Sequence, residues 1–242
     1  MSNAWVNWGR NQKCAPDQVA RPSTDTQVAK LVCLGVAERK KVRAVGAGHS
    51  FSPLCATEGI MIDLSNFNSI TRVDQELMQV TVGAGIRLFE LNKQLELLGL
   101  ALPNLGDIDC QSLAGAISTG THGTGLGFHS ISEAVVGLKM ITGDGGILQC
   151  STSKNQNFLE AARVGLGSLG IMVEVTLQCV PAFNLRAMEQ TTHIESVLEL
   201  FEAAIETEDH TEFFWFPHTE VGTLKINSKT TDSPSYRSRY KA

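Results

Sequence analysis

The stretch Val42-Arg43-Ala44-Val45-Gly46-Ala47-Gly48-His49-Ser50-Phe51-Ser52 decides how the rest of the chain is interpreted. Its first four residues form a short β-rich run that leads into a loop with two glycines, and His49 follows directly. Glycines let backbone N–H groups approach a ligand closely and converge on an anion. The loop therefore predicts a phosphate-bearing cofactor with an imidazole beside it. A histidine in an ordinary loop that only makes hydrogen bonds is the alternative, and this stretch alone leaves both interpretations open.

A second segment, Ser112-Leu-Ala-Gly-Ala-Ile-Ser-Thr-Gly-Thr-His-Gly-Thr-Gly125, favours the cofactor interpretation. Glycines alternate with hydroxyl residues, and His122 lies among them. Glycines remove the side chains that would block a flat, extended ligand, and the hydroxyls offer hydrogen bonds. Two such segments far apart in the sequence are better explained by one long cofactor held at several points than by turns.

Several common cofactor and metal motifs are absent from the sequence. The dinucleotide fingerprint G-x-G-x-x-G fails because Phe51 occupies the third glycine position after Gly46 and Gly48. There is no G-x-x-x-x-G-K-[ST] run for a nucleoside triphosphate. The six cysteines never form C-x-x-C, and the six histidines never form H-E-x-x-H. We therefore expect neither a nicotinamide nor an ATP site, and no metal site.

The order and spacing of several further motifs resemble one known family, the aldonolactone oxidase group of FAD-linked oxidases, which includes the L-gulono-1,4-lactone oxidases. This group belongs to the vanillyl-alcohol-oxidase superfamily. The resemblance extends from about residue 7 to about residue 227 and rests on the following segments: Asn7-Trp8, Arg21-Pro22-Ser23-Thr24, Gly46-Ala47-Gly48-His49-Ser50, Val80-Thr81-Val82-Gly83-Ala84-Gly85, Leu102-Pro103-Asn104-Leu105-Gly106, Gly120-Thr121-His122-Gly123-Thr124-Gly125, Ala161-Ala162-Arg163, Gly167-Ser168-Leu169-Gly170, Thr176-Leu177-Gln178-Cys179-Val180-Pro181 and Phe214-Trp215-Phe216-Pro217-His218-Thr219.

The resemblance implies an α+β fold, in which a two-part FAD-binding domain of the PCMH type is followed by the start of an α+β cap domain. It implies a covalent bond between the flavin and His49, for which the imidazole must be neutral. Residues 46–50 are then expected at the pyrophosphate, and residues 170–171 at the adenine. For His122, ordering of its loop and direct contact with the flavin are both open. The full set of cofactor-binding residues that it implies is Arg43, Val45, Gly46, Ala47, Gly48, His49, Ser50, Phe51, Ser112, Gly115, Ser118, Gly120, Thr121, His122, Gly123, Gly170 and Ile171.

The implied reaction is oxidation of the CH–OH group of a sugar-1,4-lactone, as in ascorbate-type biosynthesis, with the flavin reoxidised by O2 or another acceptor. The resemblance places the acid–base groups for the substrate in the part of the family beyond this chain, so we assign no catalytic acid or base. Nothing separates Glu174 and Glu212 from solvated residues, and for His218 a place facing the substrate and an ordinary turn position are both open. The family continues beyond the last residue of this chain, so the resemblance also implies a truncated form. Two alternatives stay open: a short form that only binds FAD, and a related flavoenzyme that acts on alditols.

Composition excludes some classes of partner. The net charge of −5 and the lack of a lysine-rich stretch give no reason to expect nucleic acid. The sequence does not begin with basic residues followed by an apolar run, so we expect no signal peptide. It has no apolar stretch long enough for a membrane span, so we expect none. The compartment is left open: the resemblance allows association with the endoplasmic reticulum membrane, and the cytoplasm is the alternative.

The hydrophobic pattern predicts an α+β unit of two small sheets with helices around them, followed after Pro181 by the start of another sheet with its helix. Ser23 is a good N-cap for the first helix, and Gly99 a good stop for the second. Gly143–Gly146 predicts a hairpin turn. We expect strands over 42–45, 60–64, 70–73, 78–82, 135–142, 147–150, 171–179, 183–190, 212–216 and 221–226, and helices over 24–39, 86–98, 157–163 and 194–207.

Three regions are expected along the chain. Residues 1–181 form the FAD-binding domain, because Pro181 marks a boundary after the last predicted strand of this region. Residues 182–227 form the partial cap domain. Residues 228–242 are rich in Ser, Thr, Lys and Arg, and we expect a disordered polar tail.

Overall fold

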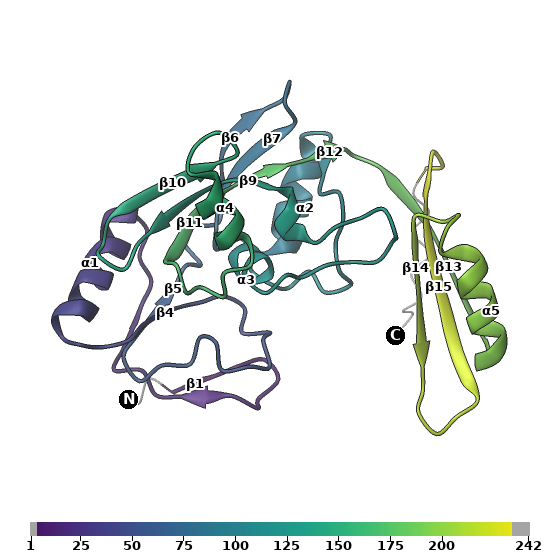
Figure 1. The fold of residues 1–242 in the computed structure, drawn as a ribbon, viewed down its shortest axis with the longest axis horizontal. Coiled ribbons are helices and arrows are strands. Elements are labelled where there is room, and N and C mark those ends of the chain that lie inside the picture. The colour runs from purple at the N-terminus through teal and green to yellow at the C-terminus, as the bar shows by residue number, and fades with distance from the viewer. Residues whose placement is uncertain (1–3, 234–242) are drawn as a thin grey trace. The chain divides into compact units, whose positions relative to one another are not determined.

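The computed structural model describes residues 4–233, and these form two compact units. The first unit contains the described residues up to His122 together with His129–Val180. The second contains Gly123–Phe128 and the described residues from Pro181 onward. Figure 1 shows strands in both units, with several helices in the first unit and, among the described residues, one helix in the second, which confirms the α+β prediction. The assignment of residues 1–181 and 182–227 to a cofactor domain and a cap stays a prediction.

The first unit begins with a small parallel sheet. Its strand order is β3-β5-β4, with β3 at Gln18–Ala20, β5 at Ile60–Asp63 and β4 at Val42–Val45. Helix α1, Asp25–Ala37, connects β3 to β4, as a crossover between parallel strands requires. Thr24, rather than Ser23, is its N-cap, because the Thr24 hydroxyl accepts from the N–H of Gln27 at 3.2 Å.

A larger antiparallel sheet forms the centre of the same unit. Its order is β10-β9-β11-β7-β6, and every neighbouring pair is antiparallel. The predicted hairpin at Gly143–Gly146 joins β9 to β10, and Gly145 has the positive φ of +80° that such a turn favours. The strands are β6 at Ile70–Asp74, β7 at Gln79–Gly83, β9 at Val135–Ile141, β10 at Ile147–Ser151 and β11 at Ile171–Gln178.

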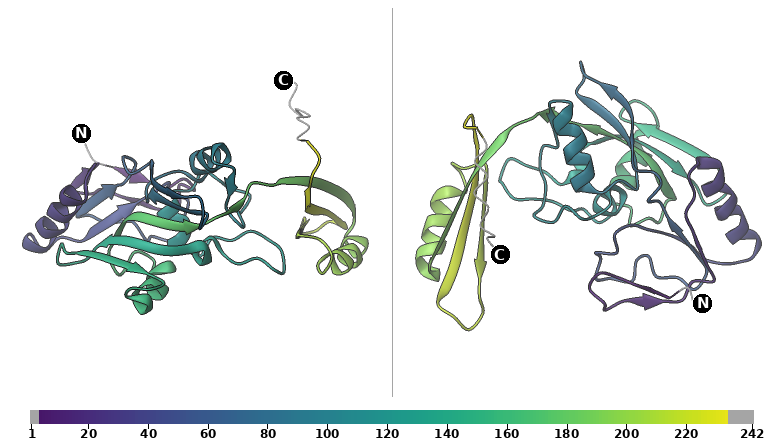
Figure 2. Two further views of the ribbon diagram at one scale, coloured as in Figure 1. Left: turned by 90° about the horizontal axis from the view of Figure 1, so that it is seen from above. Right: turned by 180° about the vertical axis from the view of Figure 1, so that it is seen from behind.

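Helices and short strands complete the first unit. Figures 1 and 2 show α1 beside the central sheet, where it packs against β9. The helices are α2 at Leu88–Leu97, α3 at Leu113–Ser118 and α4 at Gln156–Arg163, with the 3-10 turn η1 at Ile131–Ala134. The short strands are β1 at Trp5–Val6, β2 at Lys13–Cys14, β8 at Leu100–Ala101 and β12 at Val180–Pro181.

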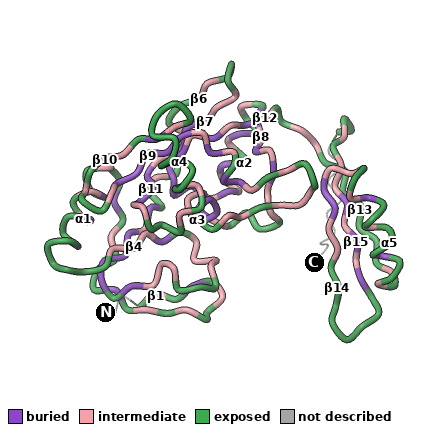
Figure 3. Tube along the Cα trace, in the orientation of Figure 1, coloured by how far each residue is buried: buried purple, intermediate pink, exposed green. Residues whose placement is uncertain are grey.

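The core of the first unit has two parts. The larger part joins the central sheet to α2, α3 and α4, and includes Val82, Leu91 and Leu177, which are completely buried. The smaller part lies between α1, β5 and the ends of β9 and β11, and includes Val28 and Ile62. The buried segments in Figure 3 follow these strands. Together the two parts fix where β4, β5 and β7 end and where β11 begins, and therefore where the adjoining loops meet.

The second unit has a sheet with strand order β13-β15-β14, and α5 runs along it (Figure 2). The elements are β13 at Asn184–His193, α5 at Ile194–Ala204, β14 at His210–Trp215 and β15 at Val221–Thr230. The prediction of a disordered tail is wrong for residues 228–230, because Ser228, Lys229 and Thr230 pair with Arg186, Leu185 and Asn184. Residues 234–242 of that expected tail lie outside the described residues. No helix among residues 4–233 is both long and apolar enough to cross a bilayer.

The core of the first unit makes a testable prediction. Leu91 on α2 is completely buried, whereas Leu97 on the same helix is 88% exposed. We expect Leu91→Ala to lower the free energy of unfolding by about 2–5 kcal/mol, because it removes buried methyl groups and leaves a cavity. Leu97→Ala should change it by less than about 0.5 kcal/mol. Urea unfolding of both variants measures this, and an equal effect of the two would contradict the packing of α2.

Candidate functional site

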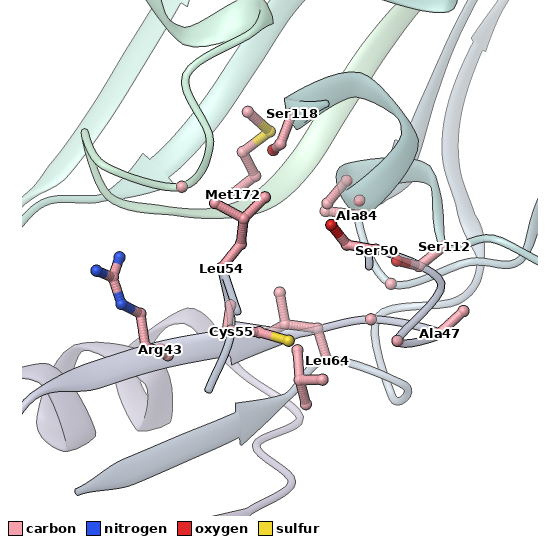
Figure 4. Close-up of a pocket in the computed structure, with 18 of the residues that line it drawn as sticks. Arg43, Ala47, Ser50, Leu54, Cys55, Leu64, Ala84, Ser112, Ser118 and Met172 are labelled. Atoms are coloured by element: carbon pink, nitrogen blue, oxygen red, sulfur yellow. The ribbon is translucent and has the colours of Figure 1, made fainter. Parts of the chain in front are cut away.

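A cavity of about 360 Å³ lies in the first unit, at the carboxyl ends of the parallel strands β4 and β5. Its volume falls within the range of about 300–1,000 Å³ that small-molecule sites occupy. Figure 4 shows lining residues that project from β4, α3 and β11. The lining consists of residues 42–51, 54–55, 63–65, 84–85, 87, 111–112, 114–115, 118–119, 166–167 and 170–172.

The loop after β4 is held from one side by the hairpin of β1 and β2. The Asn7 side chain donates to the Ser50 carbonyl at 3.0 Å, and the Trp8 N–H donates to the Gly48 carbonyl at 2.9 Å. Both Asn11 and Gln12 donate to the Phe51 carbonyl at 3.0 Å. Asn7 is buried, and its side-chain amide oxygen Oδ1 accepts from the Gln12 N–H at 3.0 Å. The hairpin therefore satisfies three carbonyl groups of this loop.

The N–H groups of the same loop are arranged differently. Within residues 4–233, the backbone N–H groups of Ala47, Gly48, His49 and Ser50 donate to no protein acceptor. All four residues line the cavity. Consecutive N–H groups of this kind make an anion-binding concavity. The expectation that residues 46–50 bind a pyrophosphate stays a prediction.

Glycine is required in this loop for two separate reasons. Gly48 has a φ of +69°, which L-residues rarely adopt. A Cβ on Gly46 would lie 1.9 Å from the Ser112 hydroxyl and 3.0 Å from the Ser112 Cβ. Ser112 is only 4% exposed, so it has little room to move. The two predicted segments, residues 46–50 and residues 112–118, therefore pack so closely at Gly46 and Ser112 that no larger residue fits at Gly46 without a shift.

The second segment forms α3, a helix that the sequence analysis did not predict. The first N–H groups of α3 are satisfied within the protein: Leu113 donates to the Ile86 carbonyl at 2.8 Å, and Ala114 to the Ala84 carbonyl at 2.9 Å. These bonds fasten α3 to the end of β7. The helix presents Gly115 and Ser118 to the cavity.

The third wall comes from the start of β11. Gly170 has a φ of +147°, and a Cβ there would lie 2.5 Å from the Ile141 carbonyl oxygen. Glycine at this position therefore lets the chain enter β11 close to β9. Ile171 and Met172 follow in the strand and line the cavity.

Charged and titratable groups line the cavity unevenly. Arg43 and Arg87 are cationic, and the Arg43 guanidinium projects from β4 into the lined space (Figure 4). Asp63 is the acidic residue of the lining: burial acts to raise its pKa, but hydrogen bonds from Arg21 and Ser65 outweigh burial and hold that pKa below its usual value. Burial raises the pKa of the Cys55 thiol, so this group is neutral at pH 7. The lining thus carries a net positive charge, which suits an anionic ligand.

Thirteen of the seventeen predicted site residues line the cavity: Arg43, Val45, Gly46, Ala47, Gly48, His49, Ser50, Phe51, Ser112, Gly115, Ser118, Gly170 and Ile171. The sequence analysis missed other lining residues, notably Cys55, Ala84, Gly85 and Arg87. Gly83-Ala84-Gly85 is part of one of the motifs on which the family resemblance rests. Its small side chains were the signal that could have identified Ala84 and Gly85 as lining residues.

Gly120, Thr121, His122 and Gly123 do not line the cavity. Gly120 ends α3 with a φ of +67°, the usual conformation of a glycine after a helix. Thr121 accepts a hydrogen bond at its hydroxyl from Gln111 at 3.2 Å, and Gln111 itself lines the cavity. Gly123 belongs to the second unit. These residues shape the end of α3 and the chain that follows it.

The two carboxylates considered as catalytic groups form ion pairs with lysines and do not line the cavity. Glu174 lies 3.5 Å from the Lys139 amine, and Glu212 lies 2.8 Å from the Lys225 amine. Within residues 4–233, no group of three or more His, Cys, Asp or Glu residues is placed to hold a metal ion.

Two protein families match this chain. Residues 16–151 match the family described as an FAD-binding domain, and residues 175–242 match the D-arabinono-1,4-lactone oxidase family. The first match contains the Gly46–Ser50 loop and α3. The two matches together run through both compact units.

The chain is similar to several named lactone oxidases and a lactone dehydrogenase. The chain is 38% identical to the L-gulono-1,4-lactone dehydrogenase of Mycobacterium tuberculosis and 38% identical to the L-gulonolactone oxidase of Mus musculus, each over 97% of this chain. It is 31% identical to the D-arabinono-1,4-lactone oxidase of Kluyveromyces lactis over 93% of this chain. The chain spans 54%, 53% and 44% of these relatives' lengths, respectively.

Solved structures of cholesterol oxidase have the same fold. The Brevibacterium sterolicum enzyme superposes with a TM-score of 0.85 at 23% identity, over 97% of this chain and 48% of that chain. A His121Ala mutant of that enzyme gives a TM-score of 0.86 at 22% identity, over 97% of this chain and 49% of that chain. Together with the match to the FAD-binding domain family, these structures confirm the predicted PCMH-type fold.

The contact between Gly46 and Ser112 makes the second prediction. We expect Gly46→Ala to destabilise the protein, because the added methyl group collides with the Ser112 side chain. The cost should be about 1–3 kcal/mol, the usual range for overpacking. The double variant Gly46→Ala/Ser112→Ala should recover part of this loss, because the nearest atom is gone.

Gly143→Ala is the matched control for thermal and urea unfolding, because no atom lies within 4 Å of its added Cβ. It should be neutral or slightly stabilising. If the Gly46 and Ser112 substitutions have strictly additive effects, the two segments do not touch as described.

Proposed function

Because the chain belongs to the FAD-binding domain family that its residues 16–151 match, we propose that its cavity holds FAD and that the protein oxidises the CH–OH group of a sugar-1,4-lactone. The observation that carries the cofactor assignment is the row of four N–H groups, from Ala47 to Ser50, on the cavity wall. The names of the relatives support the substrate class. They include both oxidases and a dehydrogenase, so the electron acceptor is O2 or another oxidant.

The residues present fit an FAD molecule. The N–H groups of residues 47–50 are proposed to bind its pyrophosphate, and Arg43 and Arg87 add positive charge to the same cavity. Gly170 and Ile171 are proposed to approach the adenine. The apolar side chains of Leu54 and Met172 offer surface for a flat ring system. FAD would supply the hydride-accepting chemistry, and these residues would bind and orient it.

His49 is proposed as the point of covalent attachment. It lies directly after the loop glycines and lines the cavity. Only an imidazole with an unprotonated ring nitrogen can form such a bond, since a protonated ring has no free electron pair. The residues that the sequence analysis expected at the cofactor but that lie outside the cavity lining, Gly120 to Gly123, are proposed to order the chain that follows α3.

The third prediction concerns the covalent bond. Purified protein precipitated with acid should give a yellow pellet, because a covalent link survives unfolding. His49→Ala should still bind FAD through the loop N–H groups but release all yellow colour to the supernatant. The measurement is flavin absorbance in both fractions. A colourless wild-type pellet alongside a yellow supernatant would show that the cofactor is held only by noncovalent contacts.

The fourth prediction concerns the substrate class. When L-gulono-1,4-lactone or D-arabinono-1,4-lactone is added without oxygen, the absorbance of the bound flavin should bleach. Xylitol, an alditol, should leave the spectrum unchanged. Bleaching by xylitol alone would favour an alditol oxidase, and bound flavin that no compound reduces would favour a protein that only binds FAD. A protein without any flavin absorbance after incubation with FAD would overturn the cofactor assignment itself.

A further inference from the structure

The ring of Trp8 stacks on the ring of His49. Their centroids are 5.1 Å apart, and the planes meet at 25°. Trp8 does not line the cavity, whereas His49 does. The indole therefore contacts an imidazole that faces the cofactor site without itself forming part of the wall.

Trp8 is held in place by its backbone and by its neighbours. Its N–H donates to the Gly48 carbonyl, one residue before His49, at 2.9 Å. Its ring also meets the Phe51 ring edge-on, with centroids 6.5 Å apart. Gly9 follows it in the turn, and a Cβ there would lie 2.7 Å from the Phe51 ring. Trp8 thus contacts residues that precede and follow His49 in the sequence, Gly48 and Phe51, as well as His49 itself.

The exposure of Trp8 needs an explanation. Its side chain is 63% exposed, although tryptophan usually buries most of its large apolar surface. Burial in a core therefore does not account for this residue. Its contacts instead concentrate on the short loop that contains His49.

We propose that Trp8 is a positioning residue for flavin attachment at His49: it holds the imidazole plane and stabilises the positive charge that the ring acquires during attack. This inference rests on the proposed function, in particular on His49 as the attachment site. A cation over an aromatic face is attracted by the negative face of the ring.

The attachment step is balanced as follows. A ring nitrogen of His49 forms a bond to the 8α-methyl carbon of FAD, and that carbon and the imidazole each release one proton. Two electrons remain on the flavin. O2 then takes up these two electrons and two protons, which gives hydrogen peroxide and restores the oxidised flavin.

The test separates attachment from binding. Wild-type protein and the variants Trp8→Leu and Trp8→Phe are purified from riboflavin-limited cells and incubated with FAD. Quenching of FAD fluorescence gives the Kd at early times, and acid precipitation at intervals gives the rate of covalent attachment. Trp215→Leu is the matched control, because Trp215 is likewise exposed, at 53%, and lies in the second unit.

We expect Trp8→Leu to slow attachment by about fivefold or more, the effect of losing roughly 1 kcal/mol of cation–π stabilisation. Its Kd for FAD should stay within about twofold of wild type, since the loop N–H groups are unchanged. Trp8→Phe should restore most of the rate, because an aromatic face is retained, and Trp215→Leu should match wild type in both measurements.

Three outcomes would overturn the inference. One is an unchanged rate in Trp8→Leu. Another is parallel loss of FAD binding and attachment in both Trp8 variants, which would make Trp8 a support of the loop alone. A colourless wild-type pellet would reject His49 attachment and this inference together, whereas a yellow wild-type pellet with a normal rate in Trp8→Leu would reject only the role of Trp8.

Discussion

The hydrogen bonds from the β1–β2 hairpin to the Gly46–Phe51 loop are the constraint on which the site depends. A short glycine-containing loop has many accessible conformations, and holding it in one of them costs conformational entropy. The hairpin offsets this cost by donating to three carbonyl groups of the loop, those of Gly48, Ser50 and Phe51. The bonded residues Gly48, Ser50 and Phe51 also line the cavity, so the hairpin holds the cavity wall in one conformation. The same contacts bring Trp8 onto His49.

Close packing of backbone segments explains why small residues surround the cavity. A Cβ at Gly85 would lie 1.8 Å from the Leu64 carbonyl oxygen, so β7 can end beside the end of β5 only if this residue is glycine. Gly46 and Gly170 have similar close neighbours, Ser112 and Ile141. The glycines thus act first on the protein itself, by bringing strand ends and α3 near one another. The cavity is the space that this arrangement encloses, with the loop N–H groups on its wall.

Sequence reasoning predicted those residues of the cavity lining that belong to a short, continuous motif. The run over Val42–Val45, the loop glycines and His49 are contiguous, and periodicity placed the strands and helices within a few residues. The role of the hairpin was not predictable, because Asn7 and Ser50 are bonded across 43 residues and no local pattern encodes that contact. Helix α3 was missed because its six residues contain glycine, alanine and serine, which read as an open ligand-binding segment. The strand at Ser228–Thr230 was missed because its polar composition is also typical of a tail, and only its pairing with β13 makes it a strand.

The segment Gly120–Gly125 shows how one motif can serve two units. The chain leaves the first unit after His122 and returns at His129, so the two units are joined by three covalent crossings instead of one linker. Residues 123–128 are fixed within the second unit: the His210 ring nitrogen Nδ1 is 2.8 Å from the Thr124 carbonyl oxygen, and the Phe128 ring stacks on the His210 ring at 4.5 Å. Gly125 has a φ of +104°, and a Cβ there would lie 2.2 Å from the Asp209 carbonyl oxygen. The glycines of this motif therefore have different physical tasks, since Gly120 ends a helix beside the cavity and Gly125 allows a loop to pack against β14. A motif that reads as one cofactor-binding element in the sequence is, in the structure, divided between the first unit, which contains residues 120–122, and the second unit, which contains residues 123–125.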